Sequence, residues 1–188
     1  MSWRVIPAAA FRPMPWRNGG GTTWEIARGC FDGGPAADWH WRFSLAEIAS
    51  DGPFSVFPGI DRLLTLLSGT GINLSFAGGP PRRLAPQEDI EFPGEAEVDC
   101  TLADGPTRDL NVMVDRRMAR LVPQRGKSRI LLGPGDVAVF YALEEVSLVN
   151  GMKRITLAAG DAAVLEGSAQ GEIERGRVVW AKLERLTA

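Results

Sequence analysis

The sequence has few of the side chains that bind transition metals or form disulfides. Its 188 residues include one histidine, His40, and two cysteines, Cys30 and Cys100. A closed zinc site needs about four ligands and a catalytic one about three, so a histidine and cysteine site is not expected. The two distant cysteines provide no disulfide framework. We therefore expect no metal and no cofactor, and we interpret both cysteines as small apolar residues.

The sequence also lacks an excess of positive charge and a long apolar run. Lysine and arginine number 21 against 23 aspartate and glutamate residues, which gives a formal net charge of -2. A nucleic-acid-binding protein would normally carry a basic surplus. No run approaches the ~18 apolar residues of a membrane-spanning helix, and the N-terminus does not resemble a secretory signal. We expect a cytoplasmic protein that binds neither nucleic acid nor membrane.

Helical patterns are scarce, because 22 glycines and 13 prolines divide the chain into short segments. Several of these segments alternate with a period of two, as in residues 39–45, 72–76 and 109–114, which is typical of strands. Many short strands separated by turns predict an all-β sandwich or barrel. The one plausible helix is Asp115–Leu121, and Pro123 limits its length.

Two kinds of turn are predicted between the strands. Ser68-Gly69-Thr70-Gly71 separates two apolar runs, and this spacing favours a tight hairpin. Gly135-Asp136 and Gly160-Asp161 each precede a β-like run, which makes a weak internal repeat. In such a turn, glycine provides a positive φ and aspartate accepts hydrogen bonds from nearby backbone amides.

Aromatic residues are concentrated near the N-terminus, where five of the six tryptophans fall within the first 41 residues. They either pack into a core, as most tryptophans do, or one or two of them line a ligand pocket. The same region holds the triple glycine at residues 19–21. A phosphate-binding loop is a poor explanation for it, because residues 22–27 resemble a strand and not the start of a helix.

One segment of unusual composition resembles the signature of the HutD/Ves family. The resemblance continues through weaker motifs in the expected order and spans roughly residues 3–165. The motifs are Pro15-Trp16-Arg17-Asn18-Gly19-Gly20-Gly21-Thr22-Thr23-Trp24-Glu25, Phe57-Pro58-Gly59-Ile60-Asp61-Arg62, Leu66-Leu67-Ser68-Gly69 and Asp109-Leu110-Asn111-Val112-Met113.

The resemblance implies an all-β bicupin, with two antiparallel, jelly-roll-like β-barrels in one chain. We expect an N-terminal barrel in residues 1–115 and a C-terminal barrel in residues 116–188, with strands that could be shared between the barrels. The resemblance also implies an association with histidine utilisation in a non-catalytic or regulatory role. On that basis the expected ligand is a carboxylate intermediate of histidine breakdown, such as urocanate or formylglutamate.

Arg62 is the most informative candidate in the matched motifs, because it precedes the apolar run 63–67. Its guanidinium either pairs with a structural carboxylate, Glu25 or Asp61, or binds a ligand carboxylate through two parallel hydrogen bonds. The family resemblance brings the second interpretation close to the first, and both stay open. Polar neighbours in the motifs complete the predicted ligand-binding set, which is Arg62, Asn18, Thr22, Thr23, Glu25, Asn111 and Arg17.

Two other functions stay open. A metal-free isomerase or epimerase of a small acid or sugar would use His40 with a carboxylate or Tyr141, since histidine is the usual proton-transfer group near neutral pH. His40 lies between two tryptophans, however, and is better explained as the outward residue of a strand. A structural or partner-binding protein is the third possibility. Barrels often pair through edge strands, so a homodimer is expected.

Overall fold

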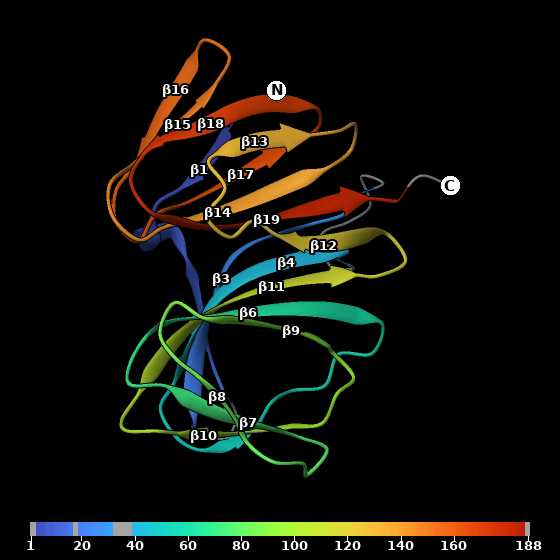
Figure 1. Ribbon diagram of the computed structural model, residues 1–188, viewed down its shortest axis with the longest axis vertical. Helices are drawn as coiled ribbons and strands as arrows, with labels where there is room; N and C mark the ends of the chain where they lie inside the picture. Colours follow the sequence, from blue (N-terminus) through green and yellow to red (C-terminus); the bar gives the residue numbers. More distant parts are fainter. Residues whose placement is uncertain (1–2, 17–18, 32–38, 187–188) are drawn as a thin grey trace. The chain divides into compact units, whose positions relative to one another are not determined.

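The computed structural model describes residues 3–16, 19–31 and 39–186. Within these ranges the chain is built from β-strands, and the one helical element is the single 3-10 turn η1 (Ala8–Ala10). The prediction of an all-β protein is confirmed (Figure 1). No helix in the described part of the chain is long and apolar enough to cross a membrane.

The strands form two compact units. The N-terminal unit lies within residues 12–30 and 35–116, and the C-terminal unit lies within residues 1–11, 31–34 and 117–188. The first strand, β1 (Trp3–Ile6), belongs to the C-terminal unit because it pairs with β17 (Ala162–Glu166). The predicted boundary between residues 115 and 116 lies close to the observed one, but the first eleven residues belong to the C-terminal unit and not to the N-terminal one.

The N-terminal unit consists of a six-stranded and a four-stranded antiparallel sheet, ordered β2-β3-β4-β11-β6-β9 and β5-β10-β7-β8. A core cluster lies between them, with Leu64 and Leu66 from the first sheet and Ile72 and Leu74 from the second. The strands are β2 (Arg12–Pro15), β3 (Gly21–Gly29), β4 (Trp41–Ile48), β5 (Gly52–Pro53), β6 (Ile60–Ser68), β7 (Ile72–Phe76), β8 (Arg82–Leu84), β9 (Asp89–Pro93), β10 (Val98–Leu102) and β11 (Thr107–Asp115).

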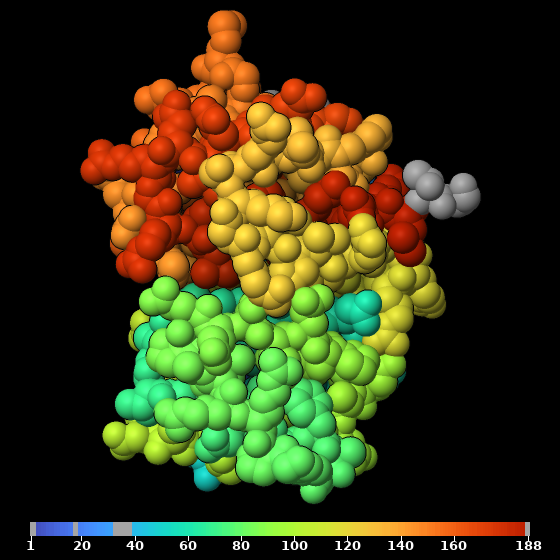
Figure 2. All heavy atoms as spheres, in the orientation of Figure 1, coloured from blue at the N-terminus to red at the C-terminus, as the bar shows by residue number. Residues whose placement is uncertain are grey.

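The C-terminal unit pairs a five-stranded sheet, β1-β17-β14-β19-β12, with a four-stranded sheet, β13-β18-β15-β16. The turn between β15 and β16 projects from the surface (Figure 2), and Met152 within it is fully exposed. The remaining strands are β12 (Ala119–Pro123), β13 (Arg129–Leu132), β14 (Val137–Ala142), β15 (Val146–Asn150), β16 (Lys153–Leu157), β18 (Ala169–Arg175) and β19 (Val178–Arg185).

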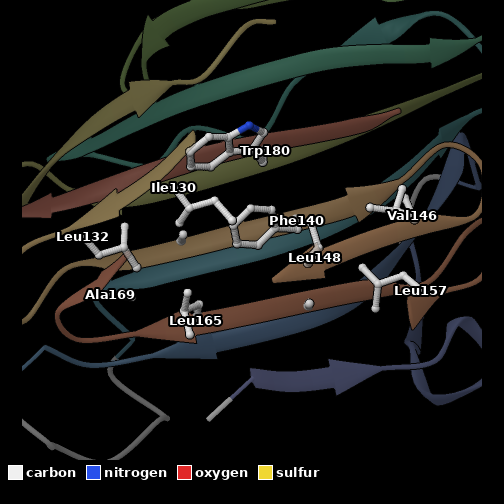
Figure 3. Close-up of a cluster of buried hydrophobic side chains, with 12 residues drawn as sticks. Ile130, Leu132, Phe140, Val146, Leu148, Leu157, Leu165, Ala169 and Trp180 are labelled. Carbon is white, nitrogen blue, oxygen red and sulfur yellow. The ribbon is translucent and has the colours of Figure 1, made fainter. Parts of the chain in front are cut away.

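Aromatic rings fill the interior of the C-terminal unit (Figure 3). Phe140 stacks on Trp180 with 5.1 Å between ring centroids, and Trp3 meets Phe140 edge-on at 5.3 Å. The surrounding residues are aliphatic, among them Leu148 and Leu165. Offset and edge-to-face aromatic contacts add to the stabilisation from apolar burial, so this interior is a packed core.

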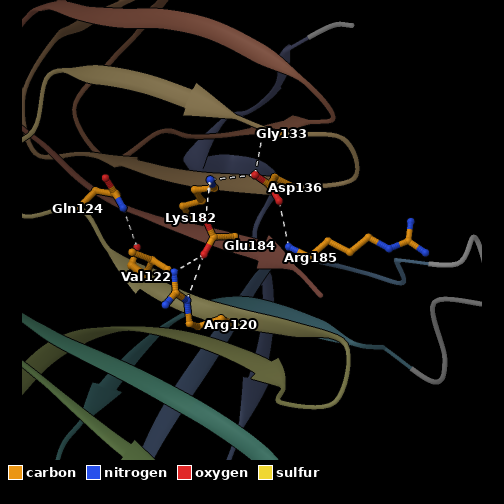
Figure 4. A network of polar contacts seen from close by, with 8 residues as sticks. All are labelled: Arg120, Val122, Gln124, Gly133, Asp136, Lys182, Glu184 and Arg185. Carbon is orange, nitrogen blue, oxygen red and sulfur yellow. Dashed lines mark hydrogen bonds and ion pairs between the residues drawn. The ribbon is translucent and has the colours of Figure 1, made fainter. Parts of the chain in front are cut away.

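The two Gly-Asp turns have the predicted structure. Gly135 and Gly160 have positive φ values of 79° and 88°. The Asp136 carboxylate accepts hydrogen bonds from the Gly133 and Arg185 amides and from the Lys182 ammonium, at 2.7, 2.9 and 2.9 Å (Figure 4). Burial opposes the Asp136 charge, but these hydrogen bonds lower its pKa on balance. The turn thus ties β14 to β19.

Two local predictions are wrong. Ser68-Gly69-Thr70-Gly71 does not close a hairpin, because β6 and β7 belong to different sheets of the N-terminal unit. Gly69 and Gly71, with φ values of 103° and 128°, let the chain cross from one sheet to the other. Asp115–Leu121 is not helical either, since β11 ends at Asp115 and β12 begins at Ala119.

The two units repeat one strand order. The sequence β4-β11-β6-β9 in the N-terminal unit has the same connectivity as β12-β19-β14-β17 in the C-terminal unit, and β5-β10-β7-β8 matches β13-β18-β15-β16. Such a repeat is compatible with a bicupin, which stays a prediction.

Candidate functional site

A cavity of about 480 Å³ lies in the N-terminal unit. Its floor is the face of the six-stranded sheet that also carries Leu64 and Leu66, and its lining includes three aromatic residues. Its volume is within the range of small-molecule pockets, which are usually apolar with a few convergent polar groups. The lining residues are Met14, Pro15, Trp16, Thr23, Arg42, Ser44, Ala46, Pro53, Phe54, Ser55, Phe57, Arg62, Asp109, Asn111 and Met113.

Arg62 of β6 is a buried cation in this cavity, with 6% of its surface exposed. Its Nη2 donates a hydrogen bond to Asn111 Oδ1 at 2.9 Å, and its Nη1 donates to the Ser55 carbonyl oxygen at 3.3 Å. Its Nε is buried and has no hydrogen-bond partner in the described part of the chain. A buried donor without a partner carries a desolvation cost, which a ligand acceptor could offset.

Three phenylalanine rings surround the Arg62 guanidinium. Its Cζ lies 4.8 Å from the Phe92 ring centroid, 5.5 Å from that of Phe54 and 5.6 Å from that of Phe57. Aromatic faces attract cations within about 6 Å. These rings hold the guanidinium in place, but they do not neutralise it, and burial lowers the pKa of Arg62 to about 10.

Asp109 and Asn111 of β11 line the cavity together with Arg62, and we call these three residues the polar row. Asn111 Nδ2 donates a hydrogen bond to Asp109 Oδ1, so the asparagine links the guanidinium to the carboxylate. Asp109 is only 1% exposed. Burial raises its pKa to about 7, although the nearby Arg62 charge acts in the opposite direction. The carboxyl can therefore change its charge near neutral pH.

A second cation in the lining, Arg42 of β4, is already paired. Its Nε donates to Glu25 Oε2 at 3.1 Å, and the other carboxylate oxygen of Glu25 lies 3.6 Å from Arg28 Nε. Trp16 Nε1 donates to Thr23 Oγ1 at 2.9 Å, which orients the indole at the cavity wall. Of the two cationic side chains in the lining, Arg62 is the one without a directly bound carboxylate among the described residues.

The structure brings part of the predicted ligand-binding set together. Arg62, Asn111 and Thr23 line the cavity, and Glu25 reaches it through Arg42. Thr22 is on the same strand as Thr23 but is not part of the lining. Arg17 and Asn18 lie outside the described residues.

The structural pairing considered for Arg62 does not occur. Glu25 pairs with Arg42 and Arg28, and Asp61 accepts a hydrogen bond from Arg116 Nε at 2.9 Å. Arg62 is the third residue of β6 and is almost fully buried. Its position follows from alternation on β6, where it shares a face with Leu64 and Leu66.

Sequence reasoning missed Asp109, Arg42 and the phenylalanines around Arg62 as site residues. A signal for Asp109 existed, since Asp109 and Asn111 are two residues apart on one strand and so share a face. The same rule places Arg42 with Ser44. The phenylalanines come from the β9 strand and the segment after β5, and no local pattern connects those segments with Arg62.

The other candidate groups do not form a site of their own. The described residues contain no group of three or more His, Cys, Asp or Glu side chains that could hold a metal ion. A cation in the cavity would meet the Arg62 guanidinium, so the donor set does not suit a metal. Cys100 is buried, and burial raises the pKa of its thiol to about 12, which makes it an inert core residue.

The sequence model of the HutD family matches residues 8–180 of the chain. An uncharacterized 21.2 kDa protein in the hutC 3′ region of Pseudomonas putida is 37% identical over 169 residues, covering 88% of this chain and 87% of that protein. Protein Ves of Cronobacter sakazakii is 40% identical over 136 residues, covering 72% of this chain and 73% of its own length.

Solved structures show the same fold. HutD from Pseudomonas fluorescens SBW25 superposes with a TM-score of 0.83 and 30% identity, covering 99% of this chain and all of that chain. A conserved protein of unknown function from Pseudomonas aeruginosa PAO1 gives a TM-score of 0.81 with 30% identity over the full length of both chains. A bacterial pirin from Escherichia coli in complex with nickel(II) is similar in fold alone, with a TM-score of 0.67 and 8% identity.

Proposed function

Because the chain belongs to the HutD family, we propose that its N-terminal unit binds a small carboxylate metabolite of histidine catabolism and acts in the regulation of histidine utilisation. The binding requires no metal in this proposal. Urocanate and formylglutamate are the candidate ligands, since each combines a carboxylate with an N–H donor. Binding would lower the free concentration of the metabolite or control an interaction of the protein.

The observation that carries the proposal is the buried Arg62 guanidinium with its unpartnered Nε. A buried arginine is costly unless its donors are satisfied, and a carboxylate is the anion whose geometry fits its planar fork. The Asp109 carboxyl is linked to Arg62 through Asn111 and, among the described residues, forms no direct ion pair with it. The guanidinium therefore donates its hydrogen bonds to neutral groups, which a ligand carboxylate can supplement or replace.

The remaining lining suits a small planar or extended acid. Trp16, Phe54 and Phe57 supply apolar surface, while Thr23 and Ser44 offer hydroxyl groups. An amide or imidazole N–H on the ligand would find acceptors among these polar groups. The cavity thus combines apolar walls, which metabolite sites usually have, with a larger share of polar groups than most such sites carry.

The proposal is tested by calorimetry with urocanate, formylglutamate and glutamate, and with an uncharged amide of one of them. At pH 6 the parent protein should bind a carboxylate ligand and should not bind the amide. Arg62→Lys keeps the cation but loses the planar fork, so affinity should fall at least tenfold, which is about 1.4 kcal/mol. Arg82→Lys is the matched control, because Arg82 is exposed on β8 and does not line the cavity.

The two negative outcomes have different meanings. If the parent binds none of the acids, the cavity is not a carboxylate site. If the parent binds them and Arg62→Lys binds equally well, the ligand is held by other residues. Circular dichroism and melting curves of both variants confirm that any loss of affinity occurs in a folded protein.

One observation also keeps an isomerase or epimerase in view. A carboxyl whose pKa lies near 7, as in Asp109, is suited to accept and return a proton at neutral pH. The residues first considered for such chemistry are less suitable, because His40 is absent from the cavity lining and Tyr141 lies on β14 of the C-terminal unit. Exchange of deuterium from solvent into a bound acid, abolished in Asp109→Asn, would support turnover over simple binding.

A further inference from the structure

Each arginine that lines the cavity has a carboxyl partner before any ligand enters. Arg42 is paired with Glu25, and Arg62 is linked through Asn111 to the buried carboxyl of Asp109. Arg28, the third arginine nearby, is partly exposed and shares Glu25. A ligand carboxylate would add a further negative charge to this buried group of charges. Such a charge is costly in a low-dielectric site unless another group is neutralised.

Asp109 is the group that can be neutralised. The Arg62 charge from β6 and the Cys100 thiol from β10 lie within electrostatic range of its carboxyl. Arg42, paired with Glu25 of β3, belongs to the same lining but lies four residues along β4 from Ala46, the residue opposite Asp109. Its other partner is the neutral Asn111 side chain. Glu25, by contrast, is paired with two arginines, which keep it ionised. Arg62 is already protonated and cannot accept another proton. Among the described residues, no cation forms an ion pair with the Asp109 carboxyl, so Asp109 is the carboxyl of this site that most readily takes up a proton.

We propose that the cavity binds a carboxylate together with one proton, which Asp109 takes up from solvent when the ligand anion replaces it as the counter-charge of Arg62. This inference rests on the proposed function and adds its regulation. The protonated Asp109 carboxyl then becomes a hydrogen-bond donor. It donates either to the ligand or, if the Asn111 side-chain amide rotates by 180°, to Asn111 Oδ1. The ligand and Asp109 are thus exchanged as anionic partners of one arginine.

The expected pH dependence has a definite sign. Burial raises the pKa of Asp109 to about 7 in the free protein, and a nearby ligand anion raises it further. The free protein carries the proton at pH 6 but not at pH 8. A carboxylate that is ionised throughout this range should therefore bind about tenfold more weakly at pH 8 than at pH 6. At pH 6 Asp109 already carries its proton in the free protein, so binding of the ligand requires no proton uptake.

Calorimetry with acetate and formate as probes tests this directly in the parent protein. Titrations in buffers with different ionisation enthalpies count the protons taken up on binding. We expect close to one proton at pH 8 and close to none at pH 6. Binding with no proton uptake at pH 8, or with the same affinity at both pH values, overturns the inference and leaves the carboxylate site intact.

The variant Asp109→Asn assigns the proton to this residue. It resembles the protonated carboxyl in shape and charge, so it should bind acetate at pH 8 about as well as the parent does at pH 6, with no proton uptake. Asp99→Asn, at an exposed position on β10, is the matched control and should behave as the parent. Uptake that persists in a folded Asp109→Asn protein would contradict the assignment.

The result separates failure of this inference from failure of the proposed function. If neither probe nor the candidate metabolites bind to the parent, the proposed function fails and the proton coupling with it. If they bind without proton uptake, only the coupling fails. Because the parent measurements decide this point, the inference remains testable even where Asp109→Asn does not fold.

Discussion

In the C-terminal unit, the inward side chains of β14 and β19 include Phe140 and Trp180, which stack on each other in a closed apolar core (Figure 3). In the N-terminal unit, the corresponding strands β6 and β11 carry Arg62, Asn111 and Asp109, which line a cavity of about 480 Å³. The strand order is the same in both units. The difference therefore arises from side chains and not from the path of the backbone.

The register of the strands shows how few positions are involved. Gly59 and Gly135, both with positive φ, precede β6 and β14, and three residues after each stand Arg62 and Ala138. Two residues further along, Leu64 pairs with Asn111 and Phe140 pairs with Trp180. Arginine and asparagine in the N-terminal unit thus occupy the places of alanine and tryptophan in the C-terminal unit. One strand order supports a filled core or a polar cavity.

The largest expected effect comes from opening the filled core. Trp180→Ala removes the ring that stacks on Phe140 and the hydrogen bond from its Nε1 to the Lys127 carbonyl oxygen, 2.9 Å long. Replacing a buried tryptophan by alanine costs about 3–5 kcal/mol. We expect the free energy of unfolding, measured by denaturant titration, to fall by that amount.

The control for this variant is Leu131→Ala, since Leu131 is exposed on β13 of the same unit. Its effect should be within about 0.5 kcal/mol of the parent. The folded fraction of Trp180→Ala should still bind carboxylate probes with the parent affinity, because the cavity belongs to the other unit. Loss of affinity without loss of stability would mean that the two interiors do not have the separate roles described above.

A smaller but more informative effect is expected from making the cavity resemble the packed core. Arg62→Leu leaves Asp109 buried without a nearby compensating cation, which should cost about 3 kcal/mol at pH 8. The folded-state pKa of Asp109 is raised above its ordinary value, so stability is lost as pH rises through that folded-state value. The variant should therefore be less impaired at pH 5.5 than at pH 8.

The triple variant Arg62→Leu, Asn111→Leu, Asp109→Leu provides the comparison. It removes all members of the polar row, so no buried charge or amide is left without a partner. Replacing a buried ionic network by apolar residues of similar volume is often neutral or stabilising. Denaturant titrations at pH 8 should show most of the lost stability restored, while calorimetry should detect no carboxylate binding. A triple variant less stable than Arg62→Leu would show that the row holds the fold together.

The sequence predicted the type of fold because strand alternation and turn chemistry are local properties. The Gly-Asp turns are an example, since both the positive φ and the aspartate hydrogen bonds follow from residues adjacent in sequence. The supposed hairpin at residues 68–71 failed for the opposite reason. A short glycine-containing connection can close a hairpin or cross between sheets, and only the pairing of distant strands decides between them.

The site was predictable in part for the same reason. Arg62 and Asn111 were found from their motifs, but their contact joins strands 49 residues apart. Alternation on β4 and β11 indicated strands with two chemically different faces, and the structure covers both faces. Trp41 and Val112 on one face and Arg42 and Asn111 on the other are all largely buried or line the cavity. Alternation identifies two faces but does not tell which one lines an interior.

The smallest expected effect concerns His40, the one histidine of the chain. Histidine is the usual source of pH dependence near neutrality, so it is the natural rival to Asp109. Its backbone joins β3 and β11, with its amide donating to the Gly29 carbonyl oxygen at 2.8 Å and its own carbonyl oxygen accepting from the Asp115 amide at 2.7 Å. His40→Gln keeps both bonds, and the side chain is not part of the cavity lining. Calorimetry between pH 6 and 8 should therefore give the parent affinity and the parent pH profile within error. A flat pH profile in His40→Gln would assign the proton to this histidine and not to Asp109. The contrast between a proton-binding cavity and an inert core would then no longer depend on the polar side chains of β11.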